Sequence, residues 1–157
     1  MANKVGSAQR VQQAFPRLGE VAKILNEKSD KLGANISVLE AKLKKLNLGV
    51  TSWVIFHSER GDEGSYHEEI GYTRINGRWG IAIRTISADF SDPQSEVREW
   101  LFNDASRTLR LRSVAKIPEL LEQLIEDANE LAKSIDEKSV EVAALASALE
   151  ETPSEEW

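Results

Sequence analysis

Several features on which enzymes, secreted proteins and membrane proteins depend are missing from this 157-residue chain. It has no cysteine, which excludes disulfide bonds, thiolate metal ligands and cysteine nucleophiles, and which fits a reducing compartment. No apolar run approaches the roughly 18 residues of a membrane-spanning helix. The N-terminus also lacks the apolar segment of a secretory signal. We therefore expect a cytoplasmic protein without a membrane span.

The motifs of the common enzyme classes are absent as well. There is no glycine-rich phosphate loop, no serine nucleophile elbow and no histidine-rich zinc helix. The two histidines, His57 and His67, flank an acidic loop, but their spacing fits no metal-binding motif and favours plain surface histidines. We expect a non-enzymatic protein that uses neither a metal nor another cofactor.

What the chain does contain is two stretches of heptad-spaced apolar residues, one near each end. The first has the row Leu18, Leu25, Leu32, Leu39 and Leu46 and the companion row Phe15, Ala22, Ser29, Ile36 and Leu43. The second has the row Leu121, Ala128, Ile135, Val142 and Leu149 and the companion row Ile117, Leu124, Leu131, Lys138 and Leu145. Such rows form the a and d seam of a coiled coil. They predict long helices over residues 15–47 and 117–151, with a disordered tail over residues 152–157.

The two seams match each other as an antiparallel pair. When Leu46 is set opposite Leu121, the only polar residues of the two seams, Ser29 and Lys138, fall in the same layer. Residues 1–49 carry a formal charge of +5 and residues 117–157 carry −10, so the two stretches attract each other. The polar layer fixes the register and the opposite charges select the partner, and both favour a long antiparallel helical hairpin. The alternative is two ordinary amphipathic helices of a globular domain.

A flank of small or short side chains runs beside both seams. It comprises Gly19, Asn26, Gly33, Ala132, Ser139 and Ala146. Glycine inside a helix costs about 1 kcal/mol relative to alanine, a cost that close packing of another backbone explains. We take this flank as a candidate interface for a second hairpin in a homodimer. The alternative is a solvated face.

The middle of the chain has the pattern of strands. Residues 50–57, 66–75, 78–87 and 97–102 are rich in β-branched and aromatic residues, which predicts an antiparallel meander over residues 50–103. Asn76-Gly77 indicates a two-residue hairpin turn, which sets Ile75 opposite Arg78 and Glu69 opposite Arg84. Residues 104–116 have the pattern of a short helix.

The turn also assigns the two faces of the central hairpin. One face is apolar and is expected to be core, whereas the other has small side chains together with His67, Glu69 and Arg84. We expect this second face to be open and shallow. An arginine fork suits a carboxylate or phosphate, so these three residues are a candidate ligand surface. The alternative is a plain cross-strand salt bridge.

A basic cluster lies near the predicted short helix. Its members are Arg98, Arg107, Arg110, Arg112 and Lys116, with Trp100 close by. Such a cluster suits an anionic partner, but residues 50–116 sum to −1 and the whole chain to −6, so we do not expect nucleic-acid binding.

Taken as a whole, the sequence predicts a single α+β domain over residues 1–157. Its core elements are a coiled-coil-like antiparallel helical hairpin and an inserted sheet of three or four antiparallel strands. We predict a non-enzymatic adaptor, regulator or inhibitor that binds a protein partner through the hairpin as a homodimer. The alternative is a small-ligand-binding or hydrolytic protein that uses the open sheet face.

Overall fold

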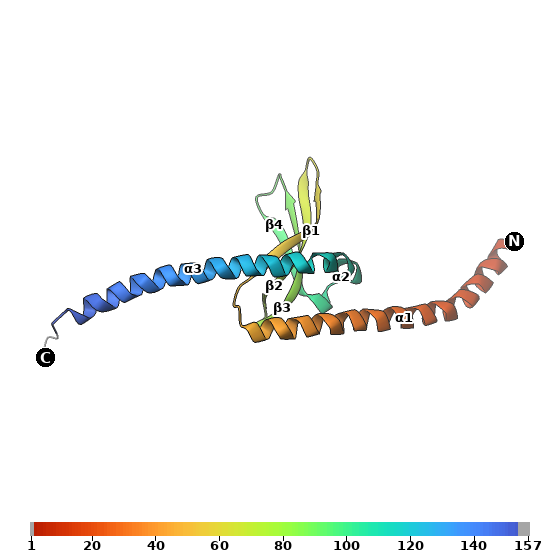
Figure 1. Cartoon of the computed structure of the whole chain (residues 1–157). Coiled ribbons are helices and arrows are strands. Elements are labelled where there is room, and N and C mark those ends of the chain that lie inside the picture. Colours follow the sequence, from red (N-terminus) through yellow and green to blue (C-terminus); the bar gives the residue numbers. More distant parts are fainter. Residues whose placement is uncertain (1, 154–157) are drawn as a thin grey trace. The chain divides into compact units, whose positions relative to one another are not determined.

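The computed structural model describes residues 2–153. In chain order the elements are α1 (Ala2–Leu46), β1 (Ser52–Arg60), β2 (Gly64–Ile75), β3 (Arg78–Asp89), β4 (Ser95–Leu101), the 3₁₀ turn η1 (Phe102–Asp104), α2 (Arg107–Ser113), the 3₁₀ turn η2 (Val114–Lys116) and α3 (Ile117–Glu150) (Figure 1). Backbone contacts divide the chain into two compact units, Met1–Lys45 and Leu46–Trp157. The described part of the first unit is helix α1, and the second unit holds the sheet and the other helices. The assignment of the whole chain to one domain stays a prediction.

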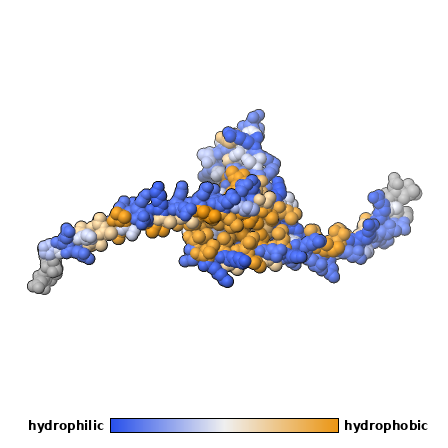
Figure 2. All heavy atoms as spheres, viewed as in Figure 1, coloured by the Kyte–Doolittle hydropathy of each residue, from blue (hydrophilic) through white to orange (hydrophobic). Residues whose placement is uncertain are grey.

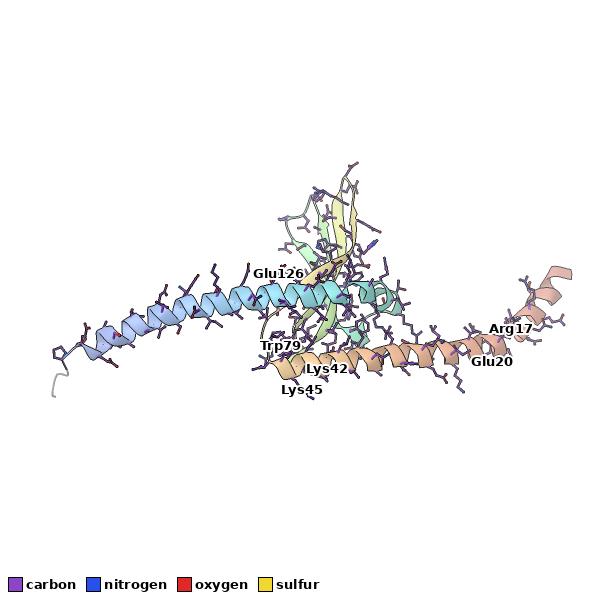
Figure 3. All side chains as sticks on the ribbon, in the orientation of Figure 1. Arg17, Glu20, Lys42, Lys45, Trp79 and Glu126 are labelled. Atoms are coloured by element: carbon purple, nitrogen blue, oxygen red, sulfur yellow. The ribbon has the colours of Figure 1, made fainter. Side chains whose placement is uncertain are left out.

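Helix α1 is longer than its heptad pattern. It begins at Ala2, well before residue 15, because residues ahead of the seam include good helix formers such as Gln12 and Gln13. Pro16 lies inside the helix, and α1 bends close to Arg17 (Figure 3). Proline lacks the N–H that would bond to the preceding turn and clashes with its carbonyl, which accounts for the bend.

The C-terminal end of α1 follows the expected stop signals. Lys44 and Lys45 occupy the last turn, where their charge opposes the negative end of the helix dipole. Asn47 and Gly49 then adopt positive φ angles of 50° and 63°. These two left-handed residues terminate the helix ahead of β1.

The sheet is a four-stranded antiparallel meander in the order β1-β2-β3-β4. Asn76 and Gly77 have φ angles of 50° and 79°, as the two-residue turn requires. The predicted register is confirmed, since Ile75 pairs with Arg78 and Glu69 with Arg84. Thus the α+β class with an antiparallel sheet is confirmed.

The core of the second unit lies between one face of this sheet and the helices that cover it. Ile70, Tyr72, Ile81 and Ile83 are buried on that face, as the turn predicted. Helix α3 contacts β1 and β2, and α2 contacts the first three strands. Burial of each large apolar side chain contributes about 1.5–3 kcal/mol. The end of the sheet that projects beyond α3, at the top of the view, is by contrast mostly hydrophilic (Figure 2).

The predicted short helix over residues 104–116 is broken into three pieces. The turns η1 and η2 bracket α2, whose N-cap Ser106 accepts a hydrogen bond from the Leu109 N–H. Pro118 stands in the first turn of α3, where no N–H is needed. Helix α3 ends at Glu150, and residues 154–157 of the predicted tail lie outside the described residues.

Two further points concern the long helices. Among residues 2–153, none of the helices is both long and apolar enough to cross a membrane. The antiparallel pairing of α1 with α3 is not confirmed and stays a prediction.

Candidate functional site

Helix α3 has two sections with different surroundings, and the first anchors the helix to the sheet. Leu120 is fully buried and Leu124 nearly so. The Ser52 hydroxyl of β1 donates a hydrogen bond to Asp127 over 2.5 Å, and the Gln123 amide donates to the same carboxylate over 3.0 Å. This section is therefore fixed by an apolar core and a polar clamp.

The most buried residue of that section lies off the predicted seam. The heptad assignment used Leu121, which is 39 % exposed, whereas its neighbour Leu120 is 0 % exposed. The seam was assigned as a pure coiled coil, and here the sheet, not a second helix, sets the orientation of the helix. The sequence signal for Leu120 was present, since it lies four residues before Leu124 on one helix face.

The second section of α3, residues 129–150, exposes its apolar residues. Its large exposed side chains are Leu131, Ile135, Val140, Val142, Leu145 and Leu149. Figure 2 shows apolar residues along this part of the helix, which extends past the sheet. All of these except Val140 belong to the predicted seam. An extended apolar stripe exposed on a polar helix marks an interaction surface.

Helix α1 carries an exposed stripe of its own. Its large exposed side chains include Val11, Phe15, Leu18, Val21, Ile24 and Leu25. Most of the stability of a helix in a protein comes from packing its apolar face against other elements. Both long helices therefore carry apolar seam residues that are open to solvent.

The polar residue of the α3 seam has a partner on its own helix. The Lys138 ammonium lies 3.1 Å from a carboxylate oxygen of Glu141, one turn along the helix, and both side chains are exposed. An exposed ion pair of this kind contributes only a few tenths of a kcal/mol.

The predicted small-residue flank lies on both helices. Ala132, Ser139 and Ala146 are exposed on α3, and Asn26 is exposed on α1. A Cβ added at Gly19 would meet nothing within 4 Å. The carbonyl of Gly33 accepts a hydrogen bond from the Ser37 hydroxyl within α1. The use of this flank as an interface stays a prediction.

The sheet face that carries Glu69 and Arg84 is not the open surface that we expected. Because β1 sets Trp53 opposite Gly71, the indole ring lies over the glycine, where a Cβ would approach the ring to 2.3 Å. The Arg84 guanidinium stacks on that ring with 4.0 Å to the ring centroid. The β1–β2 loop gives no register signal, so the sequence did not reveal Trp53 as the cover.

The ion pair itself forms as expected. The Arg84 Nε donates to a carboxylate oxygen of Glu69, and an Arg84 Nη lies 4.0 Å from Glu99. Glu69 is buried, and His67 lies on the same strand opposite Ile86. The engagement of Arg84 with a ring and two carboxylates favours the structural salt bridge over a ligand surface. Among residues 2–153, no cluster of three or more His, Asp or Glu side chains could hold a metal ion.

A second polar cluster lies on the opposite, core-facing side of the sheet and was missed. Glu68 is 1 % exposed although it carries a charge. Its Oε2 accepts a hydrogen bond from the Tyr66 hydroxyl over 2.7 Å, and its Oε1 lies 3.3 Å from an Arg112 Nη of α2. Burial, followed by the hydrogen bond to Glu68, raises the pKa of Tyr66 to about 12. The strand alternation did contain this signal, since it sets Glu68 on the same face as Ile70 and Tyr72.

Comparisons with protein-family models, with curated proteins and with solved structures find no match for this chain.

Proposed function

We propose that this chain is a non-enzymatic interaction protein, an adaptor, regulator or inhibitor, that acts through the apolar seams of its two long helices as a homodimer. The observation that carries the proposal is the exposed stripe on residues 129–150 of α3. This section extends for roughly 30 Å at about 1.5 Å per residue. Burying each of its large apolar side chains would contribute about 1.5–3 kcal/mol to the free energy of association. An occupant with a matching apolar stripe would therefore bind favourably.

The charge of α3 selects the kind of occupant. The segment of residues 117–157 carries −10, which repels nucleic acid and anionic membrane surfaces. The segment of residues 1–49 carries +5 and has a stripe of the same heptad spacing. The best-matched occupant of the α3 seam is therefore α1, from the same chain or from a second copy.

The layers of such a pair are specific. With Leu46 opposite Leu121, Leu18 faces Leu149, Leu25 faces Val142 and Ser29 faces Lys138. The polar layer disfavours other registers, because a shift would set Lys138 against an apolar residue. The same layers arise within one hairpin or between two chains, and the small-residue flank then accepts the second hairpin of a four-helix homodimer.

The chain offers a matched pair of variants to test the seam. Val142 lies on the seam and is 61 % exposed, whereas Val140 lies on the opposite side of the helix and is 68 % exposed. A carboxylate at Val142 would be buried in an apolar layer, but at Val140 it would stay in water. We expect light scattering coupled to gel filtration to give a dimer for the wild type and for V140E, and a monomer for V142E. A monomeric wild type, or equal behaviour of the two variants, contradicts the proposal.

Engineered cysteines test the register, because the chain has no cysteine of its own. L25C with V142C would join one predicted layer, and L25C with V140C is the control. Disulfide formation requires the Cα atoms to lie within about 7 Å, so only the first pair should cross-link under mild oxidation. Electrophoresis without reductant then separates a cross-link within one chain from a cross-link between two. Equal yields for the two pairs would show that the register is wrong.

A further inference from the structure

A polar cleft lies on the core-facing side of the sheet, between the sheet and α2. The strand register assembles its floor from rows of facing residues. One row is Tyr66, Ser87 and Glu96, and the next is Glu68, Thr85 and Arg98. Trp100 of β4 and residues of α2, including Thr108 and Arg112, complete the lining, and the cleft has a volume of about 420 Å³. Small-molecule sites commonly have volumes of about 300–1,000 Å³.

Glu68 in this cleft has an unusual environment. It is 1 % exposed, and its Oε2 is satisfied by the Tyr66 hydroxyl, but its buried Oε1 has no hydrogen-bond partner in the structure. A carboxylate is buried at substantial cost unless it is paired. The Arg112 guanidinium of α2 forms an ion pair with this carboxylate at 3.3 Å. A small rotation of the guanidinium would complete the second hydrogen bond, so Glu68 is placed to hold and orient Arg112.

Arg112 has donors beyond those that face Glu68. A guanidinium carries five N–H donors, and the Arg112 side chain is 45 % exposed. Arg98 contributes a second guanidinium from β4, where it pairs with Glu96 at 2.9 Å. Because each carboxylate of the cleft is paired with an arginine, neither presents an uncompensated negative charge to a ligand. Hydroxyls of Thr85, Ser87 and Thr108 supply further donors.

We propose that this cleft binds the phosphate group of a small phosphate ester. Arg112, oriented by Glu68, and Arg98 hold the phosphate, the threonine and serine hydroxyls take its remaining oxygens, and Trp100 contacts the organic part. A phosphate offers more acceptor oxygens than a carboxylate and therefore matches this donor-rich lining better. The site also gives a role to two arginines of the basic cluster that the helix seams do not use. It lies on the sheet, and so its test is independent of self-association.

Calorimetric titration at low salt provides the test. Phenyl phosphate, inorganic phosphate and phenol serve as probes for the ester, the free anion and the organic part. We expect phenyl phosphate to bind more tightly than inorganic phosphate, and phenol not to bind. If phenyl phosphate gives no binding isotherm up to about 10 mM, its binding free energy is weaker than about 3 kcal/mol. That result would overturn the proposal. Equal affinity for the two phosphates would overturn the assignment of an ester.

Variants assign the binding to these residues. R112Q should weaken phenyl phosphate binding by about tenfold or more, which is the loss expected for one charge-assisted hydrogen bond. R112K keeps the positive charge but lacks the planar guanidinium, so its affinity for phenyl phosphate should be lower than that of the wild type as well. R98Q replaces an exposed guanidinium with a neutral amide and tests the site without disturbing buried Glu68. R78Q, at the exposed β2–β3 turn, is the control and should bind like the wild type. Unchanged affinity in both R112Q and R98Q would refute the site.

Discussion

Replacement of Leu120 by alanine tests how α3 is anchored to the sheet, and its neighbour Leu121 provides the control. Leu120 is 0 % exposed, whereas Leu121 is 39 % exposed. Removing a buried leucine side chain costs its transfer free energy plus a cavity term, about 3 kcal/mol in a site that cannot collapse. At Leu121 much of the side chain is already in water, so L121A should cost about 1 kcal/mol or less.

Urea unfolding followed by tryptophan fluorescence measures both values. Both substitutions are made in V142E, so that self-association through the seam does not contribute. With a slope of about 2 kcal/mol per molar urea, L120A should lower the midpoint by about 1.5 M and L121A by about 0.5 M or less. The slope itself should not change, because both variants bury nearly the same surface. Equal losses of stability in the two variants, or a larger loss in L121A, would refute the reasoning from the burial of Leu120.

Two further substitutions probe the two faces of the sheet. G71A should lower the free energy of unfolding by about 1–3 kcal/mol, because the new Cβ would approach the Trp53 ring to 2.3 Å; G19A, which meets nothing within 4 Å, is the matched control and should not destabilise the monomeric V142E protein in the same urea assay. Y66F should alter the pH dependence of stability above pH 10, since the pKa of Tyr66 is raised from 10.0 to about 12 in the folded state. The wild type loses the contribution of Tyr66 as pH rises from about 10 to about 12, whereas Y66F should lose less over that window; identical pH profiles would contradict the raised pKa of Tyr66.

The central hairpin shows what the sequence could predict. The Asn76-Gly77 turn needs positive φ at both positions, and this local requirement fixes every pair from Ile75–Arg78 to Glu69–Arg84. The register follows from adjacent residues and needs no knowledge of the rest of the fold. The alternation along β2 then separates the core face from the other face.

The parts that could not be predicted depend on contacts between segments that are distant in sequence. The cover of Gly71 by Trp53 depends on the β1–β2 register, which includes an irregularity between Ile55 and His57. Glu68 lies on the face that the turn assigns to the core, but its partner Arg112 belongs to a short helix whose position the sequence does not determine.

The geometry of α3 connects the anchored section to the exposed one. At about 3.6 residues per turn, Leu120, Leu124, Leu131 and Lys138 fall within about 40° of one another, and Leu145 and Leu149 join the same stripe. The stripe that packs on the sheet therefore continues past its edge without a change of face. An occupant of residues 129–150 would then lie on the same side of α3 as the sheet and would extend the core. Lys138 stands in the middle of this stripe, and its ion pair with Glu141 supplies the countercharge that a buried polar layer requires. This continuity favours a helix such as α1, which matches both the apolar layers and the single polar layer.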